Sequence, residues 1–397
     1  MGRIGKTPLA WKNLTHDWRR LAVAIAGIGF AVLLMFTQVG FQNALFDSQA
    51  KLIDDLQGEI FIVSKAKFTL AAEKRFSITR LLQAQSCPGV AGAYPVYSEL
   101  TTSVLRQIEN GIGDRGFPIR SIGFELGDPV FNVGSINQQV DRLRQPGTAL
   151  IDRKSKKKKF VFPRDDDQQL AKQSLELSGK RLRLVGTFEL GTDFAHDGNL
   201  VMSADSFGDY YPHRKRFGDP LSVIDIGVVH LTEGADLGKT LSILRQTLTR
   251  DVDVLTRAEF RAAEVGFWDE STPIGTVFLF GKIIGFIVGM VICYQVIYSD
   301  IADHMPEFAT LKAMGYPAFY FVKLIVVEAL LLAVVGFIPG TAISRLIYGW
   351  LAGQTGLLMT MSVNGILFVL CATIAMCVAS GLLALRKLLA ADPASLF

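Results

Sequence analysis

Four long apolar stretches stand out in the hydrophobic pattern of this 397-residue chain, one near its start and three in its last third. The first covers 21–46 without a charged residue, and at about 1.5 Å per residue it can cross roughly 30 Å of hydrocarbon. It lacks a small-residue cleavage site and is too long for a signal-peptide core, so we expect a retained anchor. The others cover 274–299, 318–339 and 363–385. The pattern predicts four transmembrane helices.

Basic residues beside these stretches indicate how they cross the membrane, because cytoplasmic flanks carry an excess of Lys and Arg. Such residues precede the first stretch and follow the last: Arg3, Lys6, Lys12, Arg19, Arg20, Arg386 and Lys387. We therefore expect 1–20 and 386–397 to be cytoplasmic, and 47–272 and a turn at 340–362 to lie outside. Within 1–20, apolar residues at helical spacing favour an amphipathic interfacial helix; a solvated basic tail is the alternative.

The polar region between the first two stretches has shorter runs. Its two ends, about 47–110 and 221–265, share a strand–helix–strand plan, which is consistent with a split α/β unit. Residues 118–220 predict a β-rich insert between them. The predicted fold class is an α+β membrane protein: four transmembrane helices, with a large extracytoplasmic α/β domain between helices 1 and 2.

Composition argues against several functions. The net charge of +4 is small beside 41 basic and 37 acidic residues, which gives no support to nucleic-acid binding. Cys87 is alone in the polar region, so we expect no disulfide there. The five histidines show no metal-ligand spacing, and we predict neither a metal site nor a bound cofactor. Since no nucleophile–base arrangement stands out, we interpret the chain as non-catalytic.

Four polar motifs resemble ligand sites but have simpler interpretations. Gly111–Gly116 matches a dinucleotide fingerprint in letters, yet a β-type segment follows it instead of a helix. Gly234–Thr240 has three residues between its glycines where a P-loop needs four, so we predict a helix cap. Asp165–Asp167 suits a solvated acidic turn better than a cation site. Lys154–Lys159, with five lysines, suits a solvated loop tip; a lipid-headgroup or partner contact is the alternative.

Small and ionisable residues interrupt the later apolar stretches. Gly281, Gly285 and Gly289 recur every four residues, which permits close helix approach, although glycines scattered by chance remain an alternative. Lys282 and Glu328 are costly at membrane depth unless paired or wetted. Our hypothesis is that they approach each other or share a wet crevice; the alternative is that Lys282 extends outward to the interface.

The loop 300–317 is acidic for a cytoplasmic segment, with three acids and one lysine. A short helix is predicted after Pro306, with Gly315 ending it and Phe308, Leu311 and Met314 on one face. A short amphipathic helix between two spans lies on lipid or docks into another protein. Lipid docking usually needs excess Lys and Arg, so the composition favours a protein groove.

This loop resembles the coupling helix of FtsX/MacB-type permeases, the membrane subunits of mechanotransmission ABC exporters. The resemblance rests on Glu307–Tyr316 and on a closing basic and Asp-Pro signature, Arg386–Leu396. Further motifs resemble the DevC branch of cyanobacteria: Pro8–Trp11, Phe41–Asp47, Gly186–Gly191 and Gly275–Phe280. The lysine-rich loop departs from the family's usual pattern.

The resemblance implies a homodimeric permease in a bacterial, cyanobacterial inner membrane. A separate cytoplasmic ABC ATPase would hold the ATP and Mg²⁺, and 303–315 would occupy its groove. The implied contacts are Asp303, Glu307, Phe308, Leu311, Lys312, Met314 and Gly315. The resemblance further implies porter-like halves in the outer domain, a periplasmic adaptor, a TolC-like outer-membrane channel and a lipid-like cargo, including glycolipids. The alternative function is an FtsX-like regulator of an envelope hydrolase that transports nothing.

Overall fold

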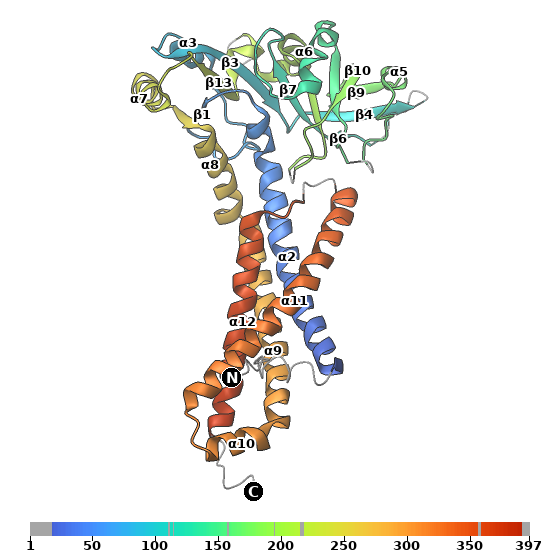
Figure 1. Cartoon of the computed structure of the whole chain (residues 1–397). Coiled ribbons are helices and arrows are strands. Elements are labelled where there is room, and N and C mark those ends of the chain that lie inside the picture. The colour runs from blue at the N-terminus through green and yellow to red at the C-terminus, as the bar shows by residue number, and fades with distance from the viewer. Residues whose placement is uncertain are drawn as a thin grey trace, which may run out of the picture. The chain divides into compact units, whose positions relative to one another are not determined.

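The computed structural model describes residues 18–109, 112–113, 115–156, 159–193, 195–214, 218–355 and 359–390. Within them, four helices are long and apolar enough to cross a membrane (Figure 1). Their bounds are α2 Trp18–Asp55, α9 Pro273–Asp303, α11 Ala318–Thr355 and α12 Val363–Ala390. The prediction of a multi-pass membrane protein is confirmed. The tail motif 391–397 and the segment 1–17 lie outside the described residues.

The third membrane helix is longer than predicted. We expected it to end at Pro339, followed by a turn over 340–362, but α11 continues through that proline to Thr355. A proline inside a helix removes one hydrogen bond without necessarily ending the helix. Here packing sustains the helix: Gly340 lies against Gly29 and Val32 of α2. Further along the same helix, the Tyr348 hydroxyl donates to the Phe36 carbonyl of α2.

The chain divides into two compact units, which are described separately. One contains the membrane helices: residues 1–43, 273–351 and 359–397. The other contains 44–272 with 352–358. In the helical unit, α9 and α12 are joined by the Ser380 hydroxyl, which donates to the Met290 carbonyl at 2.7 Å.

The second unit is a large mixed sheet with helices packed on it. The strand order is β14-β1-β13-β3-β7-β11-β8-β10-β9-β4-β5, with β6 paired to β4. The strands are β1 Ile60–Ser64, β3 Val90–Glu99, β4 Val104–Glu109, β5 Ile112–Gly113, β6 Phe117–Pro118, β7 Arg120–Phe124, β8 Thr148–Asp152, β9 Leu175–Leu177, β10 Lys180–Phe188, β11 Asn199–Ser203, β13 Ile226–Leu231 and β14 Val252–Thr256. A separate short pair joins β2 Phe76–Ser77 to β12 Val223–Ile224. The α/β fold class is confirmed.

Helices and helical turns connect these strands. They are α3 Ile78–Gln85, α4 Gly134–Asn137, η1 Val140–Arg144, α5 Asp167–Ala171, α6 Ala204–Tyr210, η2 Pro212–Arg214, η3 Pro220–Ser222, α7 Leu237–Thr247 and α8 Arg257–Glu270. Most begin with a side-chain cap; α8 has a full capping box between Thr256 and Glu259.

Long-range strand pairing joins the two predicted halves. β1 lies between β14 and β13, so strands from the beginning and end of the unit are direct neighbours. One assignment is wrong: we placed everything up to residue 110 in the first half, but β4 pairs with β6 and β9 at the insert end of the sheet. The reason is the non-local pairing of β9, which the local pattern of β4 does not reveal.

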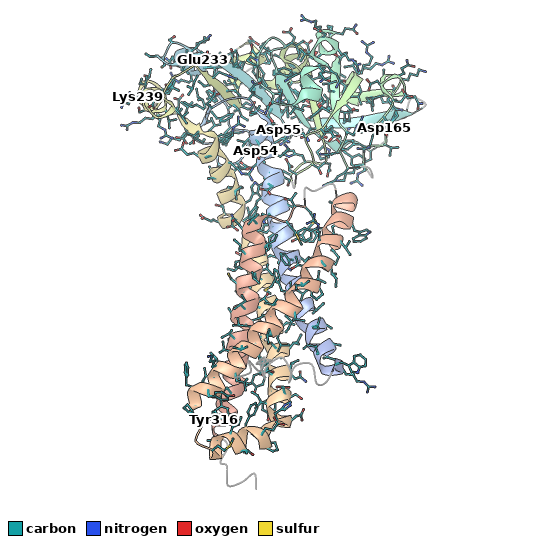
Figure 2. The ribbon with its side chains drawn as sticks, viewed as in Figure 1. Asp54, Asp55, Asp165, Glu233, Lys239 and Tyr316 are labelled. Carbon is teal, nitrogen blue, oxygen red and sulfur yellow. The ribbon has the colours of Figure 1, made fainter. Side chains whose placement is uncertain are left out.

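The end of α2 is fixed to α8 within this unit. The Arg257 guanidinium donates to the carbonyls of Ile53 and Asp54 at 2.9 Å, and Arg261 forms ion pairs with Asp47 and Asp54. Figure 2 shows Asp54 and Asp55 at this end of α2. These bonds satisfy carbonyls that a helix end leaves without helical partners.

Candidate functional site

A short helix, α10 Met305–Ala313, connects α9 to α11. Pro306 occupies its first turn, where a missing N–H costs nothing. Glu307 in the first turn and Lys312 in the last complement the helix dipole. Gly315 adopts a φ of +87°, and the Tyr316 N–H donates to the Leu311 carbonyl at 3.2 Å. The predicted helix and its glycine stop are therefore present.

One side of α10 is fixed to the helical unit. Phe308 is 4% exposed, and its ring meets that of Phe321 edge-on, with centroids 6.0 Å apart. Ala309 is buried beside it. We expected Phe308 to be a direct partner contact; the structure instead places it in the chain's own packing, because an aromatic side chain finds a partner on α11.

The other side of α10 is open. Met314, just after the helix, is 63% exposed. Glu307, Lys312, Gly315 and, at the end of α9, Asp303 are also exposed, while Leu311 is half-buried. Tyr316 (Figure 2) follows the helix and packs its ring 4.8 Å from that of Tyr320. This outer surface, formed by Glu307, Lys312, Met314 and Tyr316, is called the α10 face below.

The two ionisable residues predicted to meet within the membrane helices do not. The Lys282 ammonium donates to the Gln42 side-chain oxygen at 2.9 Å and lies 5.9 Å from the Phe368 ring centroid. The Glu328 carboxyl, 2% exposed, bonds to that of Asp300. The hypothesis of a Lys282–Glu328 pair is wrong. Each residue has a nearer polar partner on a facing helix: Gln42 on α2 for Lys282, and Asp300 on α9 for Glu328.

The three spaced glycines of α9 lie at close helix contacts. A Cβ on Gly289 would lie 2.4 Å from the Met376 sulfur and 2.7 Å from the Ala31 Cβ. At Gly285 the nearest atom would be Met35 Cγ at 3.3 Å, and at Gly281 the Gln38 side chain at 2.4 Å. The prediction of close approach is borne out, since α9 meets α2 along this row and α12 at Gly289.

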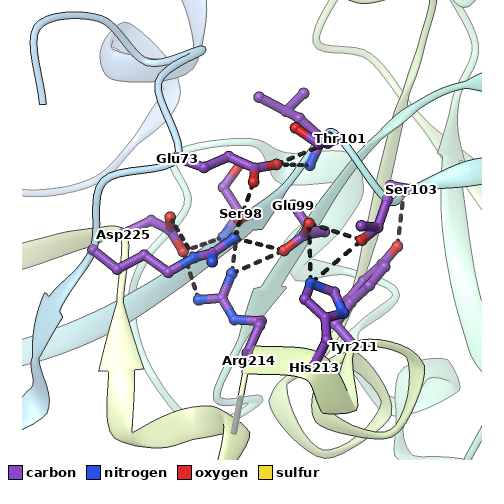
Figure 3. Close-up of polar contacts among 12 residues, drawn as sticks. Glu73, Ser98, Glu99, Thr101, Ser103, Tyr211, His213, Arg214 and Asp225 are labelled. Carbon is purple, nitrogen blue, oxygen red and sulfur yellow. Dashed lines mark hydrogen bonds and ion pairs between the residues drawn. The ribbon is translucent and has the colours of Figure 1, made fainter. Parts of the chain in front are cut away.

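Sequence reasoning missed a buried ionic network in the sheet unit (Figure 3). The Arg214 guanidinium lies between Glu99 and Asp225, at 3.3 and 2.8 Å, and donates to the Ser98 carbonyl. Arg75 joins the same two acids. Glu99, Arg214 and Asp225 are each at most 3% exposed. No local pattern identifies these residues, because their spacing in sequence has no period.

Two further groups complete this network. The Tyr211 hydroxyl is hydrogen-bonded to the Ser103 and Ser121 hydroxyls at 2.8 and 2.7 Å, and burial raises the pKa of Tyr211 to about 12. Burial alone would raise the pKa of Glu73, but the N–H groups of Thr101 and Leu100 outweigh it and hold that pKa below its ordinary value. The network therefore connects β3, η2 and the loop before β4.

Three of the four polar motifs have structural roles. Asp236 caps α7 by accepting from the Lys239 N–H, as predicted for that turn. Asp166 caps α5 in the same way. Lys156 and Lys159 both pair with Asp197, so the lysine-rich loop is tied down more firmly than a solvated tip. Lys157, Lys158 and Gly111 lie outside the described residues.

Residues 279–393 match the family model described as FtsX-like permease C-terminal. This span covers most of α9 together with α10, α11 and α12, so the predicted resemblance is confirmed for this part of the chain. The DevC branch and the cyanobacterial source stay predictions. No curated protein matches the chain.

Three solved structures are similar to about half of the chain. The periplasmic region of MacB from Actinobacillus actinomycetemcomitans has a TM-score of 0.33 and 12% identity, covering 51% of this chain and 90% of that one. The extracellular domain of the noncanonic ABC-type transporter YknZ from Gram-positive bacteria has a TM-score of 0.31 and 11% identity, covering 50% of this chain and 99% of that one. A domain of a putative permease protein from Porphyromonas gingivalis has a TM-score of 0.31 and 15% identity, covering 51% of this chain and 88% of that one.

Proposed function

We propose that this chain, with an FtsX-like permease C-terminal region at 279–393, is the membrane permease subunit of an ABC-type tripartite exporter. It converts the ATP-driven closure of a separate cytoplasmic ATPase into a conformational change of its outer domain. The observation that supports this most directly is α10. Met314, which follows the helix, is exposed, while Phe308 fixes the helix to α11.

The packing of α10 suits the transfer of force. A helix held only by its two loops would yield when a partner pressed on it. Here the buried Phe308–Phe321 contact joins α10 to α11, and the His304 ring nitrogen lies 3.0 Å from the Asp300 carbonyl oxygen of α9. A displacement of the α10 face would therefore move both membrane helices, since close-packed interiors transmit displacement.

We further propose the orientation, partners and cargo of the subunit. Both termini and α10 lie in the cytoplasm of a bacterial cell, and the sheet unit lies outside, where a periplasmic adaptor leads to a TolC-like channel. The protein acts as a homodimer and is itself non-catalytic. The cargo is lipid-like or otherwise amphiphilic, including glycolipids. The apolar side of α9, with Phe280, Ile284, Ile287 and Val291 each at least 49% exposed, suits a surface that meets lipid or a second copy.

The experiment is to purify the tagged full chain from its native membranes and measure co-purifying Mg-ATPase activity. We expect wild type to bring a stoichiometric ATPase subunit. The Met314→Asp variant places a charge on the α10 face and should lose that activity at least tenfold, because an unpaired carboxylate opposite an apolar groove costs about 1.4 kcal/mol or more.

The matched control is Leu237→Asp, the same kind of substitution at a 42%-exposed leucine of α7. It should retain the ATPase. Thr310→Cys, labelled from one side of the membrane with an impermeant maleimide, checks the sidedness. Labelling of intact cells from outside, or equal loss of ATPase in both aspartate variants, would contradict the proposal. Capture of an envelope hydrolase in place of an adaptor would favour the regulatory alternative.

A further inference from the structure

A cavity of about 240 Å³ lies in the insert end of the sheet unit. One side is formed by strands: Leu105 of β4, Leu175 of β9 and Leu184 of β10, each at most 4% exposed. The segment 159–162 forms the other side. The side chains of these strands point alternately to opposite faces, so the leucines present one continuous apolar floor.

The walls of this cavity are aromatic. Phe117 and Phe160 meet edge-on with ring centroids 6.0 Å apart, and Phe162 lies beside them. A cavity of about 240 Å³ suits one short alkyl segment. An apolar lining of this kind favours hydrocarbon over water.

Two cations line the same cavity. The Lys159 ammonium is 5.7 Å from the Phe117 ring centroid and also pairs with Asp197. Arg115 is exposed, and among the residues that the structure describes it forms no ion pair. The cavity therefore combines an apolar interior with the guanidinium of Arg115, for which the described residues provide no ion-pair partner, an arrangement that attracts an anion.

The segment that covers the cavity is held in place by its own contacts. The Arg164 guanidinium donates to the Ser155 carbonyl at 2.9 Å and to the Phe160 carbonyl at 3.3 Å, and it lies 4.5 Å from the Phe162 ring centroid. The Gln107 side chain of β4 donates to the Val161 carbonyl. The cavity is thus a built feature of the insert, and its cover is bonded to both sides.

We propose that this cavity binds a single-chain anionic amphiphile, with its carboxylate, sulfate or phosphate head at Arg115 and Lys159 and its alkyl chain over the leucine floor. This inference deepens the proposed function, because it places a binding site for the transported class of molecule in the sheet unit. It rests on the proposed function only where it identifies the bound amphiphile as the transported cargo. Binding itself requires neither the ATPase nor the α10 face.

The test uses the full chain in nanodiscs of zwitterionic lipid and a ten-carbon carboxylate that carries a photoactivatable diazirine. We expect crosslinks within 159–162 or on β4, β9 and β10, mapped by mass spectrometry. Decanoate should compete, whereas decyltrimethylammonium, which has the same chain and the opposite charge, should not. Arg115→Gln should lower labelling about tenfold, the usual loss on removing a charge-assisted hydrogen bond.

Arg106→Gln is the matched control. It removes a neighbouring cation from β4 that points away from the cavity, since Leu105 and Gln107 on either side line it. Equal loss in both variants, equal competition by the cationic amphiphile, or crosslinks confined to the membrane helices would overturn the proposal. Including phosphatidylglycerol in the nanodisc separates the sources: suppressed labelling identifies a membrane-derived anion, and unchanged labelling a free one. Loss of ATPase binding in Met314→Asp with crosslinking retained would show that the two proposals stand apart.

Discussion

The membrane helices and the sheet unit differ in how they satisfy many of their buried polar side chains. In the helices, the buried hydroxyls of Ser344 and Thr373 donate to carbonyls one turn earlier, those of Gly340 and Val369, both at 2.7 Å. In the sheet unit, buried charges pair across long stretches of chain: Arg214 meets Glu99, and Arg120 meets Asp193 at 3.0 Å. Hydrocarbon favours local satisfaction, while a water-facing domain can assemble distant ionic groups.

The difference teaches where each unit is vulnerable. The helical unit depends on shape, because small residues let helices approach closely and added volume has nowhere to go. The sheet unit depends on complete charge pairing, because removal of one partner leaves a buried charge without compensation. The two kinds of substitution should therefore have their largest effects in different units.

The largest expected effect comes from Arg214→Met. It leaves Glu99 and Asp225 buried with Arg75 as their remaining cation, and it should lower the free energy of unfolding of the sheet unit by about 3–5 kcal/mol. Pulse proteolysis of the full chain in urea would measure this. The control Arg80→Met breaks an ion pair whose partners are 24% and 50% exposed. That change should cost no more than about 1 kcal/mol. Comparable losses in the two variants would refute the contrast.

A smaller effect is expected from Gly289→Leu in the helical unit. The new side chain would collide with Met376 and Ala31, at a cost of about 1–3 kcal/mol in overpacking. Cys293 and Cys377 are fully buried, so their alkylation rate in nanodiscs reports loosening of the helices. Gly349→Leu is the control, because a Cβ there meets no atom within 4 Å. If both variants react at the wild-type rate, tight packing is not what Gly289 provides.

The smallest effect is a pH dependence in the sheet unit. Burial lowers the pKa of His196 below its ordinary value of 6.5, against the pull of Asp193, and its Nε2 has no hydrogen-bond partner within the described structure. The unfolded chain therefore binds a proton that the folded one resists, so stability should fall as the pH drops through 6.5. The slope cannot exceed about 1.4 kcal/mol per pH unit for one group.

His196→Asn should flatten that slope, as measured by unfolding at pH 7.5 and 5.5. His213→Asn, at a side chain that is 46% exposed, serves as the control. A wild-type stability that is constant over this range, or a slope that His196→Asn leaves unchanged, would show that His196 is not the responsible group.

The same contrast explains what the sequence could predict. The membrane helices and α10 follow from local signals: apolar length, Pro306 and Gly315. Their contacts were predictable only where spacing is periodic, as for Gly281, Gly285 and Gly289. The length of α11 was not, because the packing of Gly340 against α2 overrides the local effect of Pro339.

In the sheet unit, local signals predicted the strand–helix–strand ends and the cap at Asp236. They could not place β4, whose partners β6 and β9 lie at different distances along the chain. They also missed the Arg214 network and the cavity beneath 159–162, since both arise from residues that only the folded sheet brings together. Helical spacing placed Phe308, Leu311 and Met314 on one face, and this prediction is wrong: Phe308 is buried against α11, Leu311 is half-buried and Met314 is exposed. Helical periodicity does not tell whether an apolar side chain meets a partner or the chain itself.

Pro339 has a mechanical consequence for α11. Without an N–H, Pro339 cannot donate to the carbonyl of Val335, so the helix lacks one backbone hydrogen bond there. Gly336 and Gly340 lie on either side of that missing hydrogen bond and pack against α2. A helix bends most easily where a backbone hydrogen bond is absent. Pro339 is therefore the point at which α11 bends most easily, and its contacts with α2 lie beside that point. The part of the helix after Pro339 can change direction while the half that carries Phe321 and Glu328 keeps its contacts.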